Sequence, residues 1–172
     1  MGIAMAVRAR ANCHGHKVGA VIVKDRRIIS SGYNGTPEGM KNCLDGGCYR
    51  CANRDKFPSG TGYDLCICVH AEQNALLAAA RFGISVEGAK VYTTLRPCFG
   101  CAKEMLQAQI EEVFYLHPWE HPDADKQRQY DILQAKFRDL QQVHMVDPDA
   151  EWALSKPPKV VGKPDEHGHE PM

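Results

Sequence analysis

The sequence predicts one α/β domain built on a mixed sheet of about five strands. Two β-rich segments, residues 18–24 and 27–33, are separated only by Asp25 and Arg26, so they are expected to form an antiparallel hairpin. Beyond the hairpin, helical and strand-like patterns alternate, which is typical of layered α/β domains. The 172 residues are enough for one domain with its own core.

Local composition predicts the later elements. Residues 70–81 are rich in strong helix formers and stop before Gly83, which indicates a helix. Pro97 suits the first turn of a second helix that follows a β-prone strand. In chain order, the elements expected after the first helix are a strand over 90–94, a helix over 98–109, a strand over 113–116, a helix over 123–140 and a strand over 143–146.

The chain divides into a domain over residues 1–150 and a tail over 151–172 that we expect to be flexible. Four of the last 18 residues are proline, and this segment lacks a periodic apolar pattern. Within the domain, residues 40–68 look irregular and hold five of the eight cysteines. We therefore expect a Cys-rich insert there.

Composition narrows the function classes. The formal net charge is zero, which argues against a nucleic-acid polymer as partner, although residues 1–70 are basic overall and suit a small anionic substrate. There is no apolar run of roughly 18 residues and no signal-peptide pattern, so no membrane association is expected. Eight cysteines without a secretory signal indicate metal sites or free thiols in a cytoplasmic protein.

Two short motifs carry the chemistry: His70-Ala-Glu72, and Pro97 followed by Cys98 and Cys101 in a C-x-x-C pair. A catalytic zinc site takes three protein ligands and keeps one position for water, and His70, Cys98 and Cys101 supply three. Glu72 is then free to move protons between that water, a ring nitrogen and a departing amine. The order and spacing resemble the signature of zinc-dependent nucleobase deaminases.

The Cys-rich insert suggests a second, structural zinc held by four ligands. Five thiols are candidates for the four ligand positions: Cys43, Cys48, Cys51, Cys66 and Cys68. The sequence leaves open which of Cys66 and Cys68 is a ligand. Such a metal lets a segment of low apolar content fold. The alternative is a set of buried free thiols.

Beyond the zinc motif, the chain resembles deoxycytidylate (dCMP) deaminases. The resemblance rests on residues 18–23, the G-Y-N-G-x-P wording of 32–37, the H-A-E-Q-N-A wording of 70–75, and residues 97–103. It implies a three-layer α/β/α cytidine deaminase-like fold and the conversion of dCMP to dUMP with ammonia release. It also implies dCTP or dTTP effectors with Mg²⁺, and a homo-oligomer.

Four residues are candidates for substrate binding. The resemblance implies that Asn34 bonds the sugar and that Arg81 serves nucleotide recognition or regulation, the alternative for Arg81 being a surface or subunit-interface ion pair. Arg96 and Trp119 depart from the family pattern. Arg96 offers a bidentate grip on phosphate, or is a surface charge, and Trp119 can stack on a pyrimidine.

Two other functions stay open. The substrate can be another nucleotide or nucleoside, such as dCTP, a modified cytosine or a purine. The chain can also be a catalytically idle zinc-binding scaffold. The intact Glu72 argues against the scaffold, because a structural metal site has no use for a proton shuttle.

Overall fold

The computed structural model describes residues 1–57 and 59–154. Five strands form one sheet in the order β2-β1-β3-β4-β5. Their bounds are Gly19–Lys24 (β1), Arg27–Tyr33 (β2), Lys90–Leu95 (β3), Glu112–His117 (β4) and Asp139–Gln142 (β5). β1 runs antiparallel to β2 and β3, whereas β3, β4 and β5 are parallel. The expected hairpin and the expected mixed sheet are confirmed.

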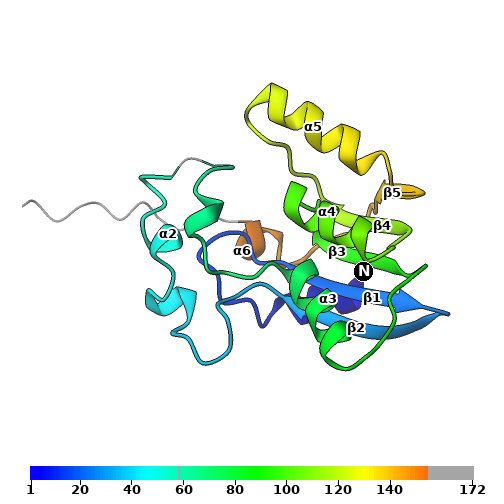
Figure 1. Cartoon of the computed structure of the whole chain (residues 1–172). Helices are drawn as coiled ribbons and strands as arrows, with labels where there is room; N and C mark the ends of the chain where they lie inside the picture. The colour runs from blue at the N-terminus through cyan, green and yellow to red at the C-terminus, as the bar shows by residue number, and fades with distance from the viewer. Residues whose placement is uncertain (58, 155–172) are drawn as a thin grey trace, which may run out of the picture.

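Helices cover both faces of this sheet (Figure 1). The helices and single turns are α1 (Gly2–Arg8), η1 (Cys43–Asp45), α2 (Tyr49–Ala52), η2 (Tyr63–Leu65), α3 (Ala71–Arg81), α4 (Phe99–Gln107), α5 (Ala124–Gln134) and α6 (Ala150–Leu154). Neighbouring residues of β1 mark the two faces: Ala20 packs with Ala71 of α3, whereas Gly19 faces the backbone of α1. The domain is therefore a three-layer α/β/α sandwich, as expected.

The main core lies between the sheet and the α3–α4 pair. Ile22 and Val91 from neighbouring strands meet Ala75 of α3 and Met105 of α4, and all four are buried. Alanine on α3 lets that helix approach the sheet closely. At Gly32 of β2 the approach is so close that an added Cβ would lie 2.2 Å from the carbonyl oxygen of Ala71. The start of α3 is therefore fixed against the hairpin by backbone contact.

The end of the domain differs from the sequence prediction. The helix expected over 123–140 ends at Gln134, and the last strand is Asp139–Gln142 rather than 143–146. Phe137 and Leu140 continue the helical spacing of apolar residues, which explains the error. In the structure Phe137 reaches the core from a turn, and Leu140 reaches it from β5, where it pairs with Val113.

The expected boundary between domain and tail, after residue 150, falls at the first residue of α6. Ala153 in this helix is fully buried, and its carbonyl accepts a hydrogen bond from the Lys17 backbone N–H at 2.9 Å. Residues 151–154 thus belong to the packed structure, and residues 155–172 of the expected tail lie outside the described residues. Among the described helices, none has both the length and the apolar character needed to cross a membrane.

Candidate active site

Three metal-ligand candidates meet where two helices begin. His70 is the N-cap of α3, Cys98 is the N-cap of α4, and Cys101 lies in the first turn of α4. Each sulfur lies 3.4 Å from Nδ1 of His70. A tetrahedral zinc with ordinary Zn–S and Zn–N bonds places such atoms about 3.6 Å apart. The three side chains can therefore hold one metal ion.

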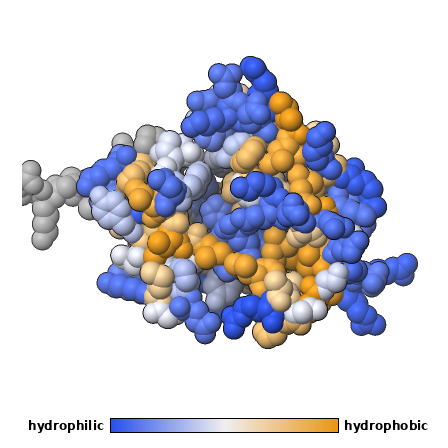
Figure 2. All heavy atoms as spheres, in the orientation of Figure 1, coloured by the Kyte–Doolittle hydropathy of each residue, from blue (hydrophilic) through white to orange (hydrophobic). Residues whose placement is uncertain are grey.

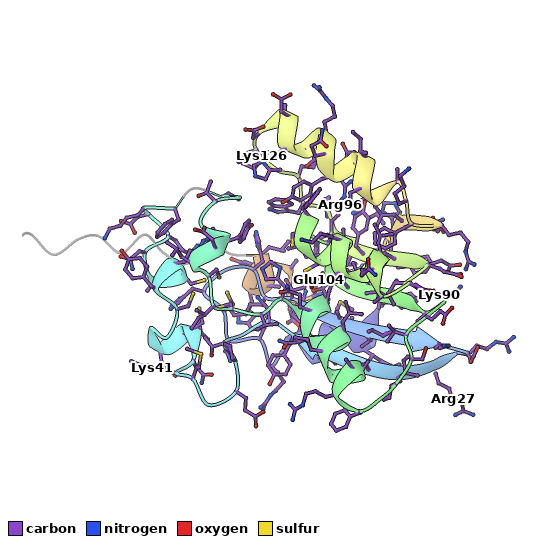
Figure 3. All side chains as sticks on the ribbon, in the orientation of Figure 1. Arg27, Lys41, Lys90, Arg96, Glu104 and Lys126 are labelled. Carbon is purple, nitrogen blue, oxygen red and sulfur yellow. The ribbon has the colours of Figure 1, made fainter. Side chains whose placement is uncertain are left out.

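Hydrogen bonds in the first turn hold His70 in place. The His70 backbone N–H donates to Oε1 of Gln73 at 2.9 Å, which closes a capping box. The other end of the same amide, Nε2 of Gln73, donates to Oε1 of Glu104 on α4 at 2.9 Å. Glu104 lies where α4 faces α3 (Figure 3). One glutamine thus ties together the two helices that carry the ligands.

Glu72 lies beside this triad and is almost fully buried, with 4% of its surface exposed. Its Oε1 accepts a hydrogen bond from the Thr93 hydroxyl of β3 at 2.8 Å. Burial raises the pKa of Glu72 above its ordinary value, and the charge of His70 partly opposes the rise. A carboxyl group with a raised pKa is suited to both taking and giving a proton near neutral pH.

The two thiols of the C-x-x-C pair differ in acidity. A hydrogen bond from Cys101, together with His70, lowers the pKa of Cys98 to about 4 although burial opposes the shift. The pKa of Cys101 rises because of Cys98 and burial. Burial lowers the pKa of His70, but the Cys98 thiolate outweighs it and raises the value to about 9. The thiolate form that binds metals is therefore favoured at Cys98.

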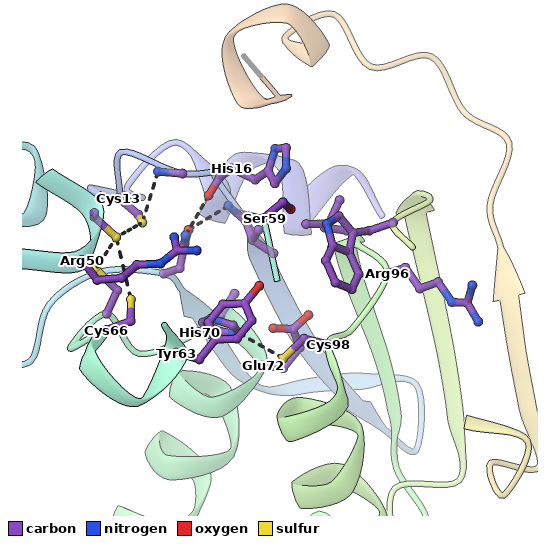
Figure 4. Close-up of a pocket in the computed structure, with 18 residues that line it drawn as sticks. Cys13, His16, Arg50, Ser59, Tyr63, Cys66, His70, Glu72, Arg96 and Cys98 are labelled. Carbon is purple, nitrogen blue, oxygen red and sulfur yellow. Dashed lines mark hydrogen bonds between the residues drawn. The ribbon is translucent and has the colours of Figure 1, made fainter. Parts of the chain in front are cut away.

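A pocket opens above Glu72 and the triad (Figure 4). Asn34 and Trp119 line it, as the sequence predicts for substrate-binding residues. The side chain of Asn34 already bonds the chain's own backbone: Oδ1 accepts from Val18 N–H at 2.8 Å, and Nδ2 donates to the His16 carbonyl at 2.8 Å. Asn34 therefore braces the loop before β1 and keeps one amide hydrogen for a ligand.

Aromatic and basic side chains that the sequence reasoning missed also line the pocket. Tyr63 packs edge-on against His70, with ring centroids 6.1 Å apart. The guanidinium of Arg50 lies 5.3 Å from the Tyr63 ring centroid and donates two hydrogen bonds to the carbonyl of Thr61. Both residues lie in the irregular insert, where no periodicity singles them out.

Two of the expected substrate contacts are not oriented toward the pocket. Arg96 borders it, but its guanidinium points away from the other lining residues (Figure 4). It donates to Gln134 and Asp131 of α5, each at 2.9 Å. Arg81 lies at the far end of α3 with 73% of its side chain exposed, 3.8 Å from Glu38. The Arg96 guanidinium is thus engaged in an ion pair with Asp131 within the chain. Arg81 does not reach this pocket.

The Cys-rich insert brings thiols together on the other side of the pocket. The five candidate thiols of the insert lie in one cluster, in which all but the partly buried Cys66 are buried, and a sixth, Cys13, joins them from the segment before β1. Cys66 and Cys68 both belong to one group of possible metal ligands, so the geometry does not select one of them over the other. Four cluster residues also line the pocket: Cys13, Cys51, Cys66 and Cys68.

The α/β/α sandwich brings a histidine and a C-x-x-C pair to two helix N-termini, beside one buried glutamate. This arrangement is the one found in zinc-binding nucleobase deaminases. A family model described as "Cytidine and deoxycytidylate deaminase zinc-binding region" matches residues 1–117. The chain belongs to this cytidine and deoxycytidylate deaminase family. The family's metal is zinc, which the donor set around His70 fits.

Relatives with known names support the same family. The chain is 42% identical over 115 residues to the deoxycytidylate deaminase of Saccharomyces cerevisiae, which covers 67% of this chain and 35% of that protein. It thus spans about a third of the length of the yeast relatives it matches. The deoxycytidylate deaminase of Mycobacterium phage D29 is 40% identical over 121 residues, which cover 67% of this chain and 89% of that one.

The fold also resembles a solved structure. The dCMP deaminase of cyanophage S-TIM5, solved in complex with dCMP and dUMP, superposes with a TM-score of 0.62 at 29% sequence identity. The match covers 83% of this chain and 92% of that chain. The cytidine deaminase-like fold expected from the sequence is therefore confirmed.

Proposed function

We propose that this chain catalyses the zinc-dependent hydrolytic deamination of a pyrimidine nucleotide, with dCMP and water giving dUMP and ammonia. The observation that carries the proposal is the buried Glu72 carboxyl beside three metal-ligand atoms at the base of one pocket. The names of the relatives, and the dCMP and dUMP bound in the cyanophage structure, support this substrate.

In the proposed mechanism His70, Cys98 and Cys101 hold the zinc ion, which supplies a water molecule of lowered pKa. Glu72 takes one proton from the attacking water and delivers it to the ring nitrogen. It then moves the remaining proton of the added hydroxyl to the amine, so that the C=O bond forms as the C–N bond breaks and ammonia leaves. Thr93 holds the Glu72 carboxylate in one orientation through its 2.8 Å hydrogen bond. Because only 4% of its surface is exposed, Glu72 is shielded from bulk water except where it lines the pocket.

Substrate recognition follows from the groups that line the pocket. We place the pyrimidine between the triad and Trp119, whose ring is held by Tyr130 at a centroid distance of 5.7 Å. Asn34 bonds the sugar through its remaining amide hydrogen. Arg50, buried at the pocket wall and flanked by Tyr63, is better oriented for the phosphate than Arg96.

A matched pair of measurements tests the proposal. Glu72→Gln is expected to keep the zinc content of the wild type and to lower kcat by roughly 10³-fold, because only the proton carrier is lost. An active Glu72→Gln protein would refute the role of Glu72. An ammonia-release panel over dCMP, CMP, dCTP, deoxycytidine, a modified cytosine and a purine nucleotide tests the substrate. Turnover of another substrate in preference to dCMP would reassign it, and no turnover with zinc fully loaded would favour the idle scaffold.

Regulation by dCTP or dTTP with Mg²⁺ is proposed on a contact between two loops. Gly35, within the G-Y-N-G-x-P loop, exchanges two backbone hydrogen bonds with Val69, at 3.2 and 2.8 Å. Val69 directly precedes His70, so an effector that moved this loop would also move a metal ligand. Titration of dCMP turnover with each nucleotide, with and without Mg²⁺, tests this coupling.

A homo-oligomer is proposed on the apolar surface over α3 and α4. Leu77 and Phe82 expose 55% and 75% of their surface there, and Ile84 lines the same groove as Leu77. The same face carries a groove between the two helices, and Figure 2 shows apolar side chains gathered over it. Light scattering on the purified protein measures its molar mass and so tests the number of subunits. We also keep the expectation of a cytoplasmic location, which fractionation would test.

A structural zinc is proposed in the Cys-rich insert, with four of its five thiols as ligands. The four that the fold brings within 4.8 Å of one another are Cys48, Cys51, Cys66 and Cys68. A complete set of four thiolates is the ligand set of a closed structural zinc site. A single zinc per chain in the purified protein would reject this second metal.

A further inference from the structure

Six thiols form two four-membered groups that overlap. One group is Cys13, Cys43, Cys51 and Cys68, and the other is Cys48, Cys51, Cys66 and Cys68. In each group the sulfur atoms lie within 4.8 Å of one another, and Cys51 and Cys68 belong to both. A single structural zinc would use one group and leave two buried thiols in contact with its ligands.

The sulfur separations match those around tetrahedral zinc. Cys51 Sγ lies 3.8 Å from Cys13 Sγ, 3.8 Å from Cys66 Sγ and 4.0 Å from Cys68 Sγ, and Cys48 lies 3.9 Å from Cys66. Two thiolates on one tetrahedral zinc with 2.3 Å bonds stand about 3.8 Å apart. A disulfide requires about 2.0 Å. The thiols are thus spaced as ligands in both groups.

The thiols also take the place of an apolar core in this part of the chain. The buried cluster consists of the cysteines, with Ile67 as the other partly buried apolar side chain packed against them. The larger apolar residues of the insert point outward: Leu44, Tyr49 and Leu65 expose 46%, 60% and 50% of their surface. A segment with so little apolar burial needs metal binding to remain folded.

Backbone donors are placed to stabilise the two thiolates that a zinc ion on Cys48, Cys51, Cys66 and Cys68 would leave unused. His14 N–H donates to Cys43 Sγ at 3.5 Å, and Gly15 N–H donates to Cys13 Sγ at 3.4 Å. Cys13 and Cys43 are the members of the other group that this single zinc ion does not bind. Hydrogen bonds to the charged form favour the thiolate, which is the form that binds metal.

We propose that the six cysteines hold two zinc ions, with the thiolates of Cys51 and Cys68 bridging them. Cys13 and Cys43 complete one tetrahedron, and Cys48 and Cys66 complete the other. The pair extends the structural zinc proposed above and does not depend on deamination. It ties the segment before β1, the insert and the approach to His70 into one unit that forms a wall of the pocket.

Zinc counting in the wild type, two single variants and their double variant tests the pair. The wild type is expected to hold three zinc ions per chain by elemental analysis and native mass spectrometry, one catalytic and two in the cluster. Cys13→Ser is expected to lose one. As a matched control, Cys98→Ser loses the catalytic ion, and the double variant keeps one ion. Two zinc ions in the wild type, or an unchanged count in Cys13→Ser, would overturn the pair. One zinc in the wild type would reject the structural zinc as well.

A measurement on the wild type covers the case in which Cys13→Ser does not fold. After exchange into ¹¹³Cd²⁺, two tetrathiolate resonances that split each other are expected, because the bridging sulfurs transmit the coupling between the two metals. A single tetrathiolate resonance, or two without mutual splitting, contradicts the bridged pair. Iron with inorganic sulfide in the purified protein would also contradict it.

Discussion

Replacing Gly32 with alanine should move the catalytic helix. A Cβ at this position would lie 2.2 Å from the Ala71 carbonyl oxygen and 2.5 Å from the Ala75 backbone nitrogen. Both are backbone atoms of α3, which cannot rotate away as a side chain can. Because packed nonbonded atoms stand more than about 3 Å apart, α3 has to shift from the sheet by about 1 Å. His70 and Glu72, in its first turn, shift with it.

The size of the effect follows from this displacement. A misplacement of about 1 Å in reacting groups costs roughly 10²-fold in rate, so kcat/KM for dCMP should fall by about that factor. Overpacking should also cost about 1–3 kcal/mol of unfolding free energy. Gly19→Ala is the matched control. Its Cβ would lie 2.2 Å from the Ala4 carbonyl oxygen and 2.5 Å from the Arg8 nitrogen, on the opposite face of the sheet.

The assay compares the two variants well below their unfolding temperatures. Urea unfolding should show similar losses of stability in both, whereas ammonia release and zinc content should fall only in Gly32→Ala. The reasoning fails if Gly32→Ala retains near wild-type turnover. It also fails if Gly19→Ala loses as much activity for the same loss of stability, because the site would then respond to stability rather than to the position of α3.

Two further predictions concern buried hydrogen bonds. Thr93→Val removes the hydrogen bond from the Thr93 hydroxyl, the only side-chain donor to the Glu72 carboxylate among the described residues. This variant should keep its zinc and lose about 10–100-fold in kcat. An unchanged kcat would contradict the positioning role of Thr93. Asp147→Asn breaks the buried bidentate ion pair with Arg8, whose hydrogen bonds measure 2.7 and 2.8 Å, and should lower the free energy of unfolding by about 3–5 kcal/mol. Arg81→Ala, which removes the exposed ion pair with Glu38, should lower it by at most about 1 kcal/mol. Hydrogen bonds from Arg8, and then His117, hold the Asp147 pKa below its ordinary value, so this stability is present above the unfolded pKa of about 3.9 and is lost as pH falls further. Urea unfolding at several pH values should therefore show the variant converging on the wild type in acid, and a constant difference would refute the linkage.

The sequence predicts those parts of the site whose residues lie close together along the chain. His70 and Glu72 share one helical turn, and Cys98 and Cys101 share another, so spacing alone places each pair at a helix N-terminus. What the sequence cannot supply is the partner across the fold. Thr93 meets Glu72 only because β3 pairs with β1 in one register, which brings position 93 under α3.

The contacts that the sequence does not reveal have the same origin. The sequence leaves Arg96 open as a phosphate contact or a surface charge, whereas in the fold the α5 helix supplies Gln134 and Asp131, which bind its guanidinium. Cys13 lies 30 residues before the first cysteine of the insert and carries no spacing motif with it. It joins the cluster because the loop before β1 is bonded to the turn after β2, through Asn34.

These contacts make the thiol cluster part of the active site's architecture. The chain runs from Cys68 through Val69, which is bonded to Gly35, directly into His70. The catalytic ligand is therefore held from both sides: α3 is seated on Gly32, and the segment before it is anchored by thiols. Because the cluster also lines the pocket, loss of the zinc proposed there would loosen the pocket wall and the approach to His70 together. A cysteine-rich insert placed immediately before the catalytic motif thus has a physical reason: it fixes a metal ligand where no apolar core is available.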